Sequence, residues 1–345
     1  MKRKTILIFF IVLCLNQTNK AQSDKSYFTT ISSKKDLKTY KKILGKSYLD
    51  SSYFFVGNIK DYQKDMDFFL NTNLQMEDIW INGYTKTYSR KIGYKNNFIY
   101  KLPKTVKFAY IESVYLPLPF DLNMNKNTLK ELIVRNCFIK GKDSVILDFS
   151  NLDSLQTLAI DHFQNKTKIY VNLKMPPNIN FFITDMPLSY ITSLPKSLEE
   201  LVIARDTIYP FFKNELPNLR TICFYANDSV SLPEEIISMI SIKSIFINDS
   251  LTYKDVELLS KIPHLDTLEL TYLKNNIFPE NIYKLTNISV IKLAYDLGEN
   301  IRDGERYKIA FYLHKLLPSV TILYKVFKRG NEGRLYEKYI KLNDY

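Results

Sequence analysis

Leu129-Lys-Glu-Leu132-Ile-Val134-Arg-Asn-Cys137-Phe-Ile139 decides the fold of this chain, because its apolar spacing recurs along the sequence. Further copies begin at positions 155, 178, 198, 219, 242, 265 and 288. Counted from 129, the first positions are separated by 26, 23, 20, 21, 23, 23 and 23 residues. Self-similarity at a period of 20–29 residues with this pattern predicts a solenoid, in which stacked repeats bury a continuous core.

Two weaker copies extend the array upstream. One contains Met76, Ile79 and Ile81, and the other contains Pro103, Val106, Phe108 and Ile111. The copy at 178 has Asn178 in the first position, followed by Phe181 and Ile183. We therefore predict about ten repeats over residues 76–298.

Each repeat is expected to contribute one short strand, in which alternate side chains face opposite sides. The two apolar residues of the Leu-x-Leu core then point inward and the residue between them points outward. The predicted outward column is Trp80, Lys107, Ile133, Ala159, Phe182, Val202, Cys223, Phe246, Glu269 and Lys292.

Six consecutive members of this column, from Ile133 to Phe246, are apolar. A contiguous apolar patch on the surface of a protein usually marks an interaction site, and aromatic residues tend to anchor it. We predict a protein-binding stripe comprising Ile133, Phe182, Val202 and Phe246, with the charged residues Lys107, Glu269 and Lys292 at its ends.

The same apolar stripe can also arise in three ways that involve no ligand. Strands favour β-branched and aromatic residues for local packing alone. A register error of one residue would place a stripe residue in the core. Either flank of the array could also fold across the face and bury it. The sequence leaves these alternatives open.

The first 21 residues have the layout of a secretory signal peptide. Lys2, Arg3 and Lys4 precede an apolar run over positions 6–15, and Ala21 is the expected cleavage site. The alternative, a lipidated Cys14, is disfavoured because bulky Leu13 precedes that cysteine. We expect a secreted or extracytoplasmic protein, in the periplasm, at the cell surface or outside the cell, with no transmembrane segment in the mature chain.

Flanking segments are expected to cap the array. Residues 22–75 form the predicted N-terminal cap, which includes a short strand at 54–56. Residues 299–345 form the predicted C-terminal cap, with a helix at 302–317, a strand at 319–327 and a polar tail.

The chemistry-bearing residues are few and scattered. Cys137 and Cys223 lie four repeats apart, too far for disulfide geometry, so we expect both to be unpaired.

The net charge of +12 falls to +8 without Lys2, Arg3, Lys4 and Lys20. The lysines of the chain are mixed with acids, so no nucleic-acid site is predicted. Nucleophile, metal and phosphate motifs are not found. Asp161 beside His162 is interpreted as a solvated surface pair. We expect no enzyme, no cofactor and no metal site.

The segments Leu129–Ile139 and Leu198-Glu-Glu-Leu201-Val-Ile203 resemble those of bacterial secreted leucine-rich repeat proteins. The resemblance covers roughly 220 residues, although Ile, Phe and Tyr often replace leucine and the turn asparagine is frequently lost. It implies an α/β solenoid, a horseshoe with a parallel β-sheet on its concave face and an irregular or short helical convex side. It also implies protein recognition by that face. The alternative function is a structural component of the bacterial envelope or of an adhesion complex.

Overall fold

The structure is a computed structural model of the whole chain. It describes residues 53–57, 78–82, 102, 104–112, 115–116, 122, 125–139, 144–161, 170–186, 191, 193–204, 216–225, 232–248, 251–270, 278–294, 303–329 and 335–342. The predicted signal peptide, Cys14 and most of the predicted N-terminal cap lie outside these residues.

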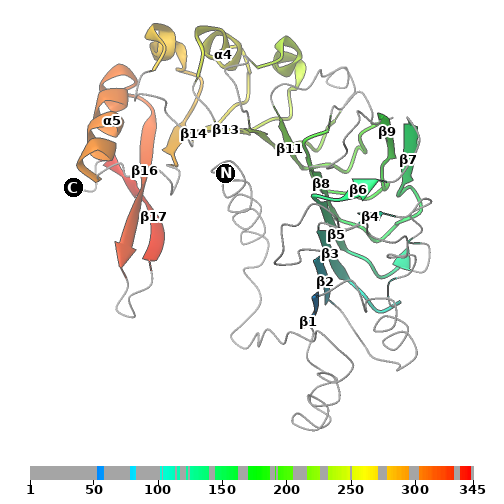
Figure 1. Cartoon of the computed structure of the whole chain (residues 1–345). Coiled ribbons are helices and arrows are strands. Elements are labelled where there is room, and N and C mark those ends of the chain that lie inside the picture. The colour runs from blue at the N-terminus through cyan, green and yellow to red at the C-terminus, as the bar shows by residue number, and fades with distance from the viewer. Residues whose placement is uncertain are drawn as a thin grey trace.

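One 13-stranded sheet runs through the molecule and curves into an arch (Figure 1). Its first twelve strands pair in parallel, and only the last pair is antiparallel. In sheet order the strands are β1 (Tyr53–Gly57), β2 (Asp78–Asn82), β3 (Phe108–Glu112), β5 (Glu131–Arg135), β8 (Thr157–Asp161), β10 (Phe181–Thr184), β11 (Glu200–Ala204), β12 (Thr221–Tyr225), β13 (Ser244–Asn248), β14 (Thr267–Leu270), β15 (Val290–Leu293), β16 (Thr321–Arg329) and β17 (Leu335–Lys341).

The repeated apolar positions explain this sheet. Leu132 pairs with Leu158, and Ile222 pairs with Ile245, so equivalent residues of successive repeats stand side by side. All four are fully buried, in one continuous apolar core that runs the length of the array. Each repeat therefore completes its core only against its neighbours, as expected for a solenoid.

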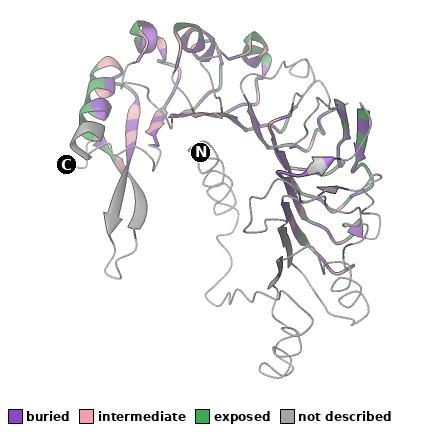
Figure 2. Ribbon diagram, viewed as in Figure 1, coloured by how far each residue is buried: buried purple, intermediate pink, exposed green. Residues whose placement is uncertain are grey.

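The convex side changes character along the arch. In the first half it carries short strands, β4 (Tyr115–Leu116), β6 (Phe138–Ile139), β7 (Ser144–Asp148) and β9 (Tyr170–Lys174), which form two small parallel sheets. In the second half it carries helices, namely the 3-10 helices η6 (Glu234–Ser238) and η8 (Glu280–Lys284) and the α-helix α4 (Tyr253–Leu259). Figure 2 shows exposed residues along this outer side and buried residues along the main sheet.

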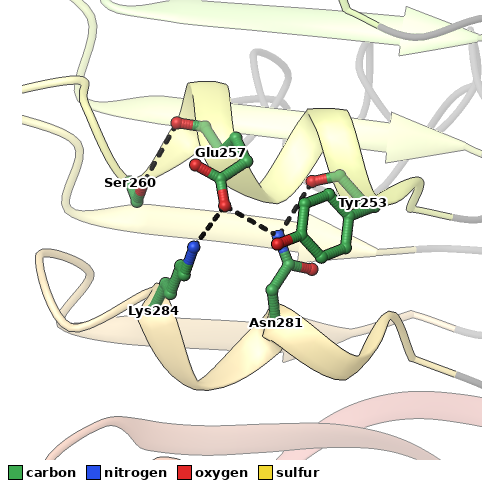
Figure 3. A network of polar contacts seen from close by, with 5 residues as sticks. All are labelled: Tyr253, Glu257, Ser260, Asn281 and Lys284. Atoms are coloured by element: carbon green, nitrogen blue, oxygen red, sulfur yellow. Dashed lines mark hydrogen bonds and ion pairs between the residues drawn. The ribbon is translucent and has the colours of Figure 1, made fainter.

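Neighbouring convex helices are joined by polar contacts (Figure 3). Glu257 of α4 accepts hydrogen bonds from Lys284 and Asn281 of η8, and the Asn281 amide also donates to the Tyr253 carbonyl at 2.9 Å. At the start of α4, Thr252 and Asp255 form a reciprocal capping box. Asp255 is completely buried and also accepts a bond from the Leu232 amide at 2.6 Å, so one carboxylate links the α4 cap to the preceding repeat.

A second set of links is a polar ladder, which we define as six residues that stand immediately before the first apolar position of their repeat. The side chain of each of the six donates to a backbone carbonyl of the preceding repeat. The members and acceptors are Thr128 to Lys104, Asn178 to Asp153, Ser197 to Pro177, Asn218 to Lys196, Ser241 to Leu216, and Asn287 to both Leu259 and Ile262, at 2.8–3.1 Å.

The predicted repeat frame is confirmed in most copies and wrong in two. In the copy at 103, Val106, Ala109 and Ile111 occupy the core positions, three residues later than predicted, and Phe108 is 37% exposed. In the copy at 178 the frame is one residue later, because Phe182 rather than Phe181 pairs with Leu158 and Leu201. The frame predicted around Ile79 and Ile81 is confirmed by their pairing with Ala109 and Ile111.

Both flanks contribute strands to the main sheet. β1, inside the predicted N-terminal cap, pairs in parallel with β2 and so extends the sheet by one strand. The predicted C-terminal helix is present as α5 (Asp303–Leu316), and the predicted strand after it is β16. β17 then turns back antiparallel to β16. None of the described helices is long and apolar enough to cross a bilayer.

Candidate concave binding site

The outward column of the concave sheet face is fixed by the strand register. From β2 to β15 it consists of Trp80, Tyr110, Ile133, Ala159, Ile183, Val202, Cys223, Phe246, Glu269 and Lys292. Eight of the ten predicted members are therefore in place, and we call this set the concave column.

Two predicted site residues are not in the concave column. The outward position predicted for Phe182 is wrong, because the frame of its repeat is shifted by one residue. The Phe182 ring lies in the core and is 0% exposed. Ile183 takes its place. Lys107 precedes strand β3, so its expected position is held by Tyr110; the Lys107 carbonyl instead accepts the Lys130 and Glu131 amides.

The apolar middle of the column is buried rather than open. Ile133, Ala159, Ile183, Val202 and Cys223 are 1–5% exposed and form a second apolar cluster with Phe181. The expectation of a continuous exposed stripe is therefore wrong over these five strands. At the two ends of this cluster, Tyr110 and Phe246 are only partly buried, and they are its accessible aromatic residues.

A buried row of alternating charges lies beside Tyr110. In three successive repeats, a charged residue follows three positions after the first apolar residue of the Leu-x-Leu core. Glu112, Arg135 and Asp161 stand side by side on β3, β5 and β8 and are 9%, 3% and 1% exposed. Arg135 Nε lies 3.5 Å from Asp161 Oδ2. A shift in the pairing of β5 and β8 would separate Arg135 from Asp161 and leave uncompensated buried charges, so this pair disfavours other registers of these two strands.

Two neighbours complete the row. The Asn136 amide donates to Glu112 Oε1 at 3.2 Å, and Asn136 has a φ of 50°, a left-handed conformation that asparagine adopts more readily than most residues. Burial, followed by the nearby Glu112, raises the pKa of the Tyr110 phenol, so the ring is neutral at physiological pH. The interpretation of Asp161 as a solvated surface acid is wrong; His162 lies outside the described residues.

The C-terminal end of the column is partly covered by the terminal hairpin. The Tyr339 hydroxyl of β17 donates to Glu269 Oε1 at 2.8 Å, and Lys292 Nζ lies 5.9 Å from the centre of the Tyr339 ring. Burial raises the pKa of Glu269, against the opposing influence of the Tyr339 hydrogen bond and of Lys292 and Lys325. One flank therefore does fold over the face, at β14 and β15.

Around Phe246 the concave face presents small polar residues. Thr221, Ser244 and Thr267 form the neighbouring outward column on β12, β13 and β14, and Asn248 lies two residues beyond Phe246 on β13; all four are partly exposed. Phe246 itself stands between Cys223 and Glu269, with Ser244 and Asn248 on its own strand. A partly exposed aromatic side chain with polar groups near it is suited to holding another polypeptide, by burial of the ring and hydrogen bonding at its rim.

Among the residues that the structure describes, no three His, Cys, Asp or Glu side chains are grouped so that they could hold a metal ion. Cys137 and Cys223 form no disulfide, as predicted, and both are buried. Cys223 holds its predicted outward position but is covered within the concave cluster.

No protein-family model matches the chain, and no curated protein matches it. Among solved structures, a leucine-rich repeat protein of Leptospira interrogans is similar at 17% sequence identity, over 64% of this chain and 55% of its own length, with a TM-score of 0.27. The fold is assigned from the chain's own strands, which stack in parallel and bury the repeated Leu-x-Leu positions in one core. It is that of a leucine-rich repeat solenoid. In this leucine-rich repeat array the concave column is the candidate site.

Proposed function

We propose that this leucine-rich repeat protein is a secreted, non-catalytic recognition protein whose concave face binds another protein. The observation that supports the proposal is the partly exposed Phe246, which shares the concave face with partly exposed Thr, Ser and Asn side chains. Tyr110, with Phe108 beside it on β3, supplies a second aromatic position on the same face. A standard interface of about 1,600 Å² would require both ends of the arch to take part.

The proposed partner contact differs from the one that the sequence suggests. Because the aliphatic residues between Ile133 and Cys223 are buried, they shape and stiffen the face but offer little area to a ligand. Affinity should then depend on a few aromatic anchors, as is common in protein interfaces. The charged residues Glu269 and Lys292, engaged by Tyr339, limit the site at its C-terminal end.

One observation supports a non-catalytic role. Asp161 lies beside Arg135 and is 1% exposed. A general base must reach its substrate's proton, so a carboxylate at this depth does not itself act as one.

Site-specific photocrosslinking tests the proposal. A photoreactive phenylalanine analogue is placed at Phe246 and, in a matched variant, at Ile240, which is 70% exposed on the opposite, convex side of the neighbouring segment. Illumination of cells that produce the protein should yield a discrete crosslinked species from position 246 alone. Identical products from both positions, or products from position 240 alone, would contradict concave recognition.

Secretion is tested in the same cells. Fractionation should recover the protein outside the cytoplasm, shortened by the mass of residues 1–21. Full-length protein confined to the cytoplasm would refute the proposed location.

A further inference from the structure

Exposed apolar side chains are concentrated on the convex side of the C-terminal half. Of nine large apolar residues that are well exposed in the described part of the chain, seven lie on or beside η6, α4, η8 and α5. They are Ile237, Ile240, Tyr253, Tyr283, Tyr307, Phe311 and Tyr312. Three of the seven belong to α5, the helix at the outer end of the arch (Figure 1).

The aromatic residues of α5 form an ordered surface. Tyr307 and Phe311 are four residues apart, so they share a helix face, and their rings stack with centres 6.0 Å apart and planes inclined by 16°. Lys315, four residues further on, places Nζ 4.7 Å from the centre of the Phe311 ring. Tyr312 flanks them and is 55% exposed.

This surface is anchored to the solenoid. Tyr307 makes an edge contact with Tyr324 of β16, with ring centres 6.3 Å apart, and Tyr324 is only 2% exposed. Ile309, Ala310 and Leu313 on the opposite side of α5 are buried in the main core. The outward rings are therefore held in place before any partner binds, which lowers the entropic cost of binding.

The charge of the surface has one sign. Lys308 and Lys315 are both exposed, and residues 307–320 contain no acid. Residues 301–345 hold ten Lys or Arg and five Asp or Glu, so this segment contributes +5 of the chain's net +12. Two copies of such a face would repel each other, which disfavours self-association through α5.

We propose that the exposed face of α5, comprising Tyr307, Lys308, Phe311, Tyr312 and Lys315, binds the surface of an anionic lipid bilayer. Tyrosine and phenylalanine rings flanked by lysines match the layering of a bilayer interface, with rings at the headgroup level and ammonium groups among the phosphates. A convex ridge meets a broad, deformable surface over its whole length, whereas a folded acidic protein would need a matching groove. The concave face stays free for its own partner.

Vesicle co-sedimentation tests this inference. The protein used is the form that accumulates in the producing cells, without any engineered truncation. Phosphatidylcholine vesicles are compared with vesicles that also contain phosphatidylglycerol. Wild type should partition onto the anionic vesicles and much less onto the neutral ones. The variant Phe311→Ser/Tyr312→Ser should bind more weakly at unchanged salt, and Lys308→Gln/Lys315→Gln should lose about fivefold in partitioning for each lysine removed.

The matched control is Ile146→Ser, which removes a side chain that is 58% exposed on β7, in the other half of the molecule. It should bind as wild type does, and thermal unfolding should show that all variants are folded at the assay temperature, because each altered side chain lies outside the buried core. Three outcomes would overturn the proposal: no preference for anionic vesicles, full binding by Phe311→Ser/Tyr312→Ser, or an equal loss in the Ile146→Ser control.

Discussion

Phe181 and Phe182 are adjacent aromatic residues that face opposite sides of β10. Phe182 is enclosed in the main core, whereas Phe181 joins Ile183 in the concave cluster. Because both faces of this strand are apolar, the sequence alternation that normally assigns inside and outside is absent here. The neighbouring strands decide it, since pairing with Leu158 and Leu201 leaves Phe182 only the inner side.

We expect Phe182→Ala to lower the free energy of unfolding by about 3–5 kcal/mol, because it opens a cavity in a close-packed core. Phe246→Ala should lower it by less than about 2 kcal/mol, since that ring is already partly in solvent. Urea unfolding followed by circular dichroism measures both. Equal losses would show that Phe246 is as deeply packed as Phe182.

Glu269 is a residue whose surroundings make its charge unfavourable. Burial raises the pKa of its carboxyl, so the folded state binds the proton more tightly than the unfolded state does. The unfavourable contribution of this carboxyl is absent at low pH. It grows as pH rises from the unfolded value of 4.5 through the higher folded pKa.

Glu269→Gln should therefore be more stable than wild type at pH 7 and gain no such advantage at pH 3. The glutamine side chain remains neutral and its oxygen can still accept the Tyr339 hydroxyl. Thermal unfolding of both proteins across this pH range gives the difference. If the variant is less stable at pH 7, the attraction of Lys292 and Lys325 outweighs the burial of the carboxylate.

At the scale of elements, the repeats are joined by polar side chains that the leucine pattern does not reveal. The polar ladder places Thr, Ser or Asn immediately before the first apolar position, where its side chain satisfies carbonyl groups of the previous turn. The bonds of Ser241 and Asn287 are partly buried, where a carbonyl group without a partner is costly, and the other four lie at the surface. Short polar side chains suit this position because they reach nearby backbone groups. The signal is visible in the sequence as a recurring small polar residue, at Thr128, Asn178, Ser197, Asn218, Ser241 and Asn287.

Asn287→Ala should destabilise the protein by about 1–2 kcal/mol, because one amide group bonds both Leu259 and Ile262 carbonyls at 3.0 Å. Ser289→Ala is the matched control: it lies two residues further on, it is exposed, and its backbone amide bond to Asp266 is kept. Chemical unfolding of the two variants should separate them clearly. If both variants lose a similar amount of unfolding free energy, the polar ladder does not contribute specifically to stability.

At the scale of the whole molecule, the sheet ends are where a solenoid is vulnerable. β15 is covered by β16, which in turn pairs with β17, and α5 packs against β16 with its buried face in the core. Without this terminal unit, the edge of β15 and the apolar residues beneath it would meet water, and exposed strand edges promote association.

A chain that ends before residue 303 should therefore aggregate or unfold, as measured by size-exclusion chromatography with light scattering. A second truncation, after residue 330, removes β17 but keeps α5 and β16, so the apolar core beneath β15 stays covered. It exposes the edge of β16 together with Glu269 and Lys292, and we expect it to stay folded and to associate less than the chain that ends before residue 303. If the chain that ends before residue 303 is monodisperse, the repeat array is stable without its C-terminal cap.

The recurring Leu-x-x-Leu-x-Leu spacing by itself determined the solenoid, the parallel sheet and most of the concave column, and helical spacing determined the terminal helix. These follow from local alternation and a constant period, which sequence records directly. The sequence did not determine the register at Val106 and Phe182, the deep burial of the column from Ile133 to Cys223 and of the Arg135–Asp161 pair, or the Tyr339 contact with Glu269. Those depend on how closely neighbouring strands pack and on where the terminal hairpin folds. Only the tertiary structure decides them, because the repeat period places equivalent positions side by side but fixes neither their burial nor a contact made from outside the array.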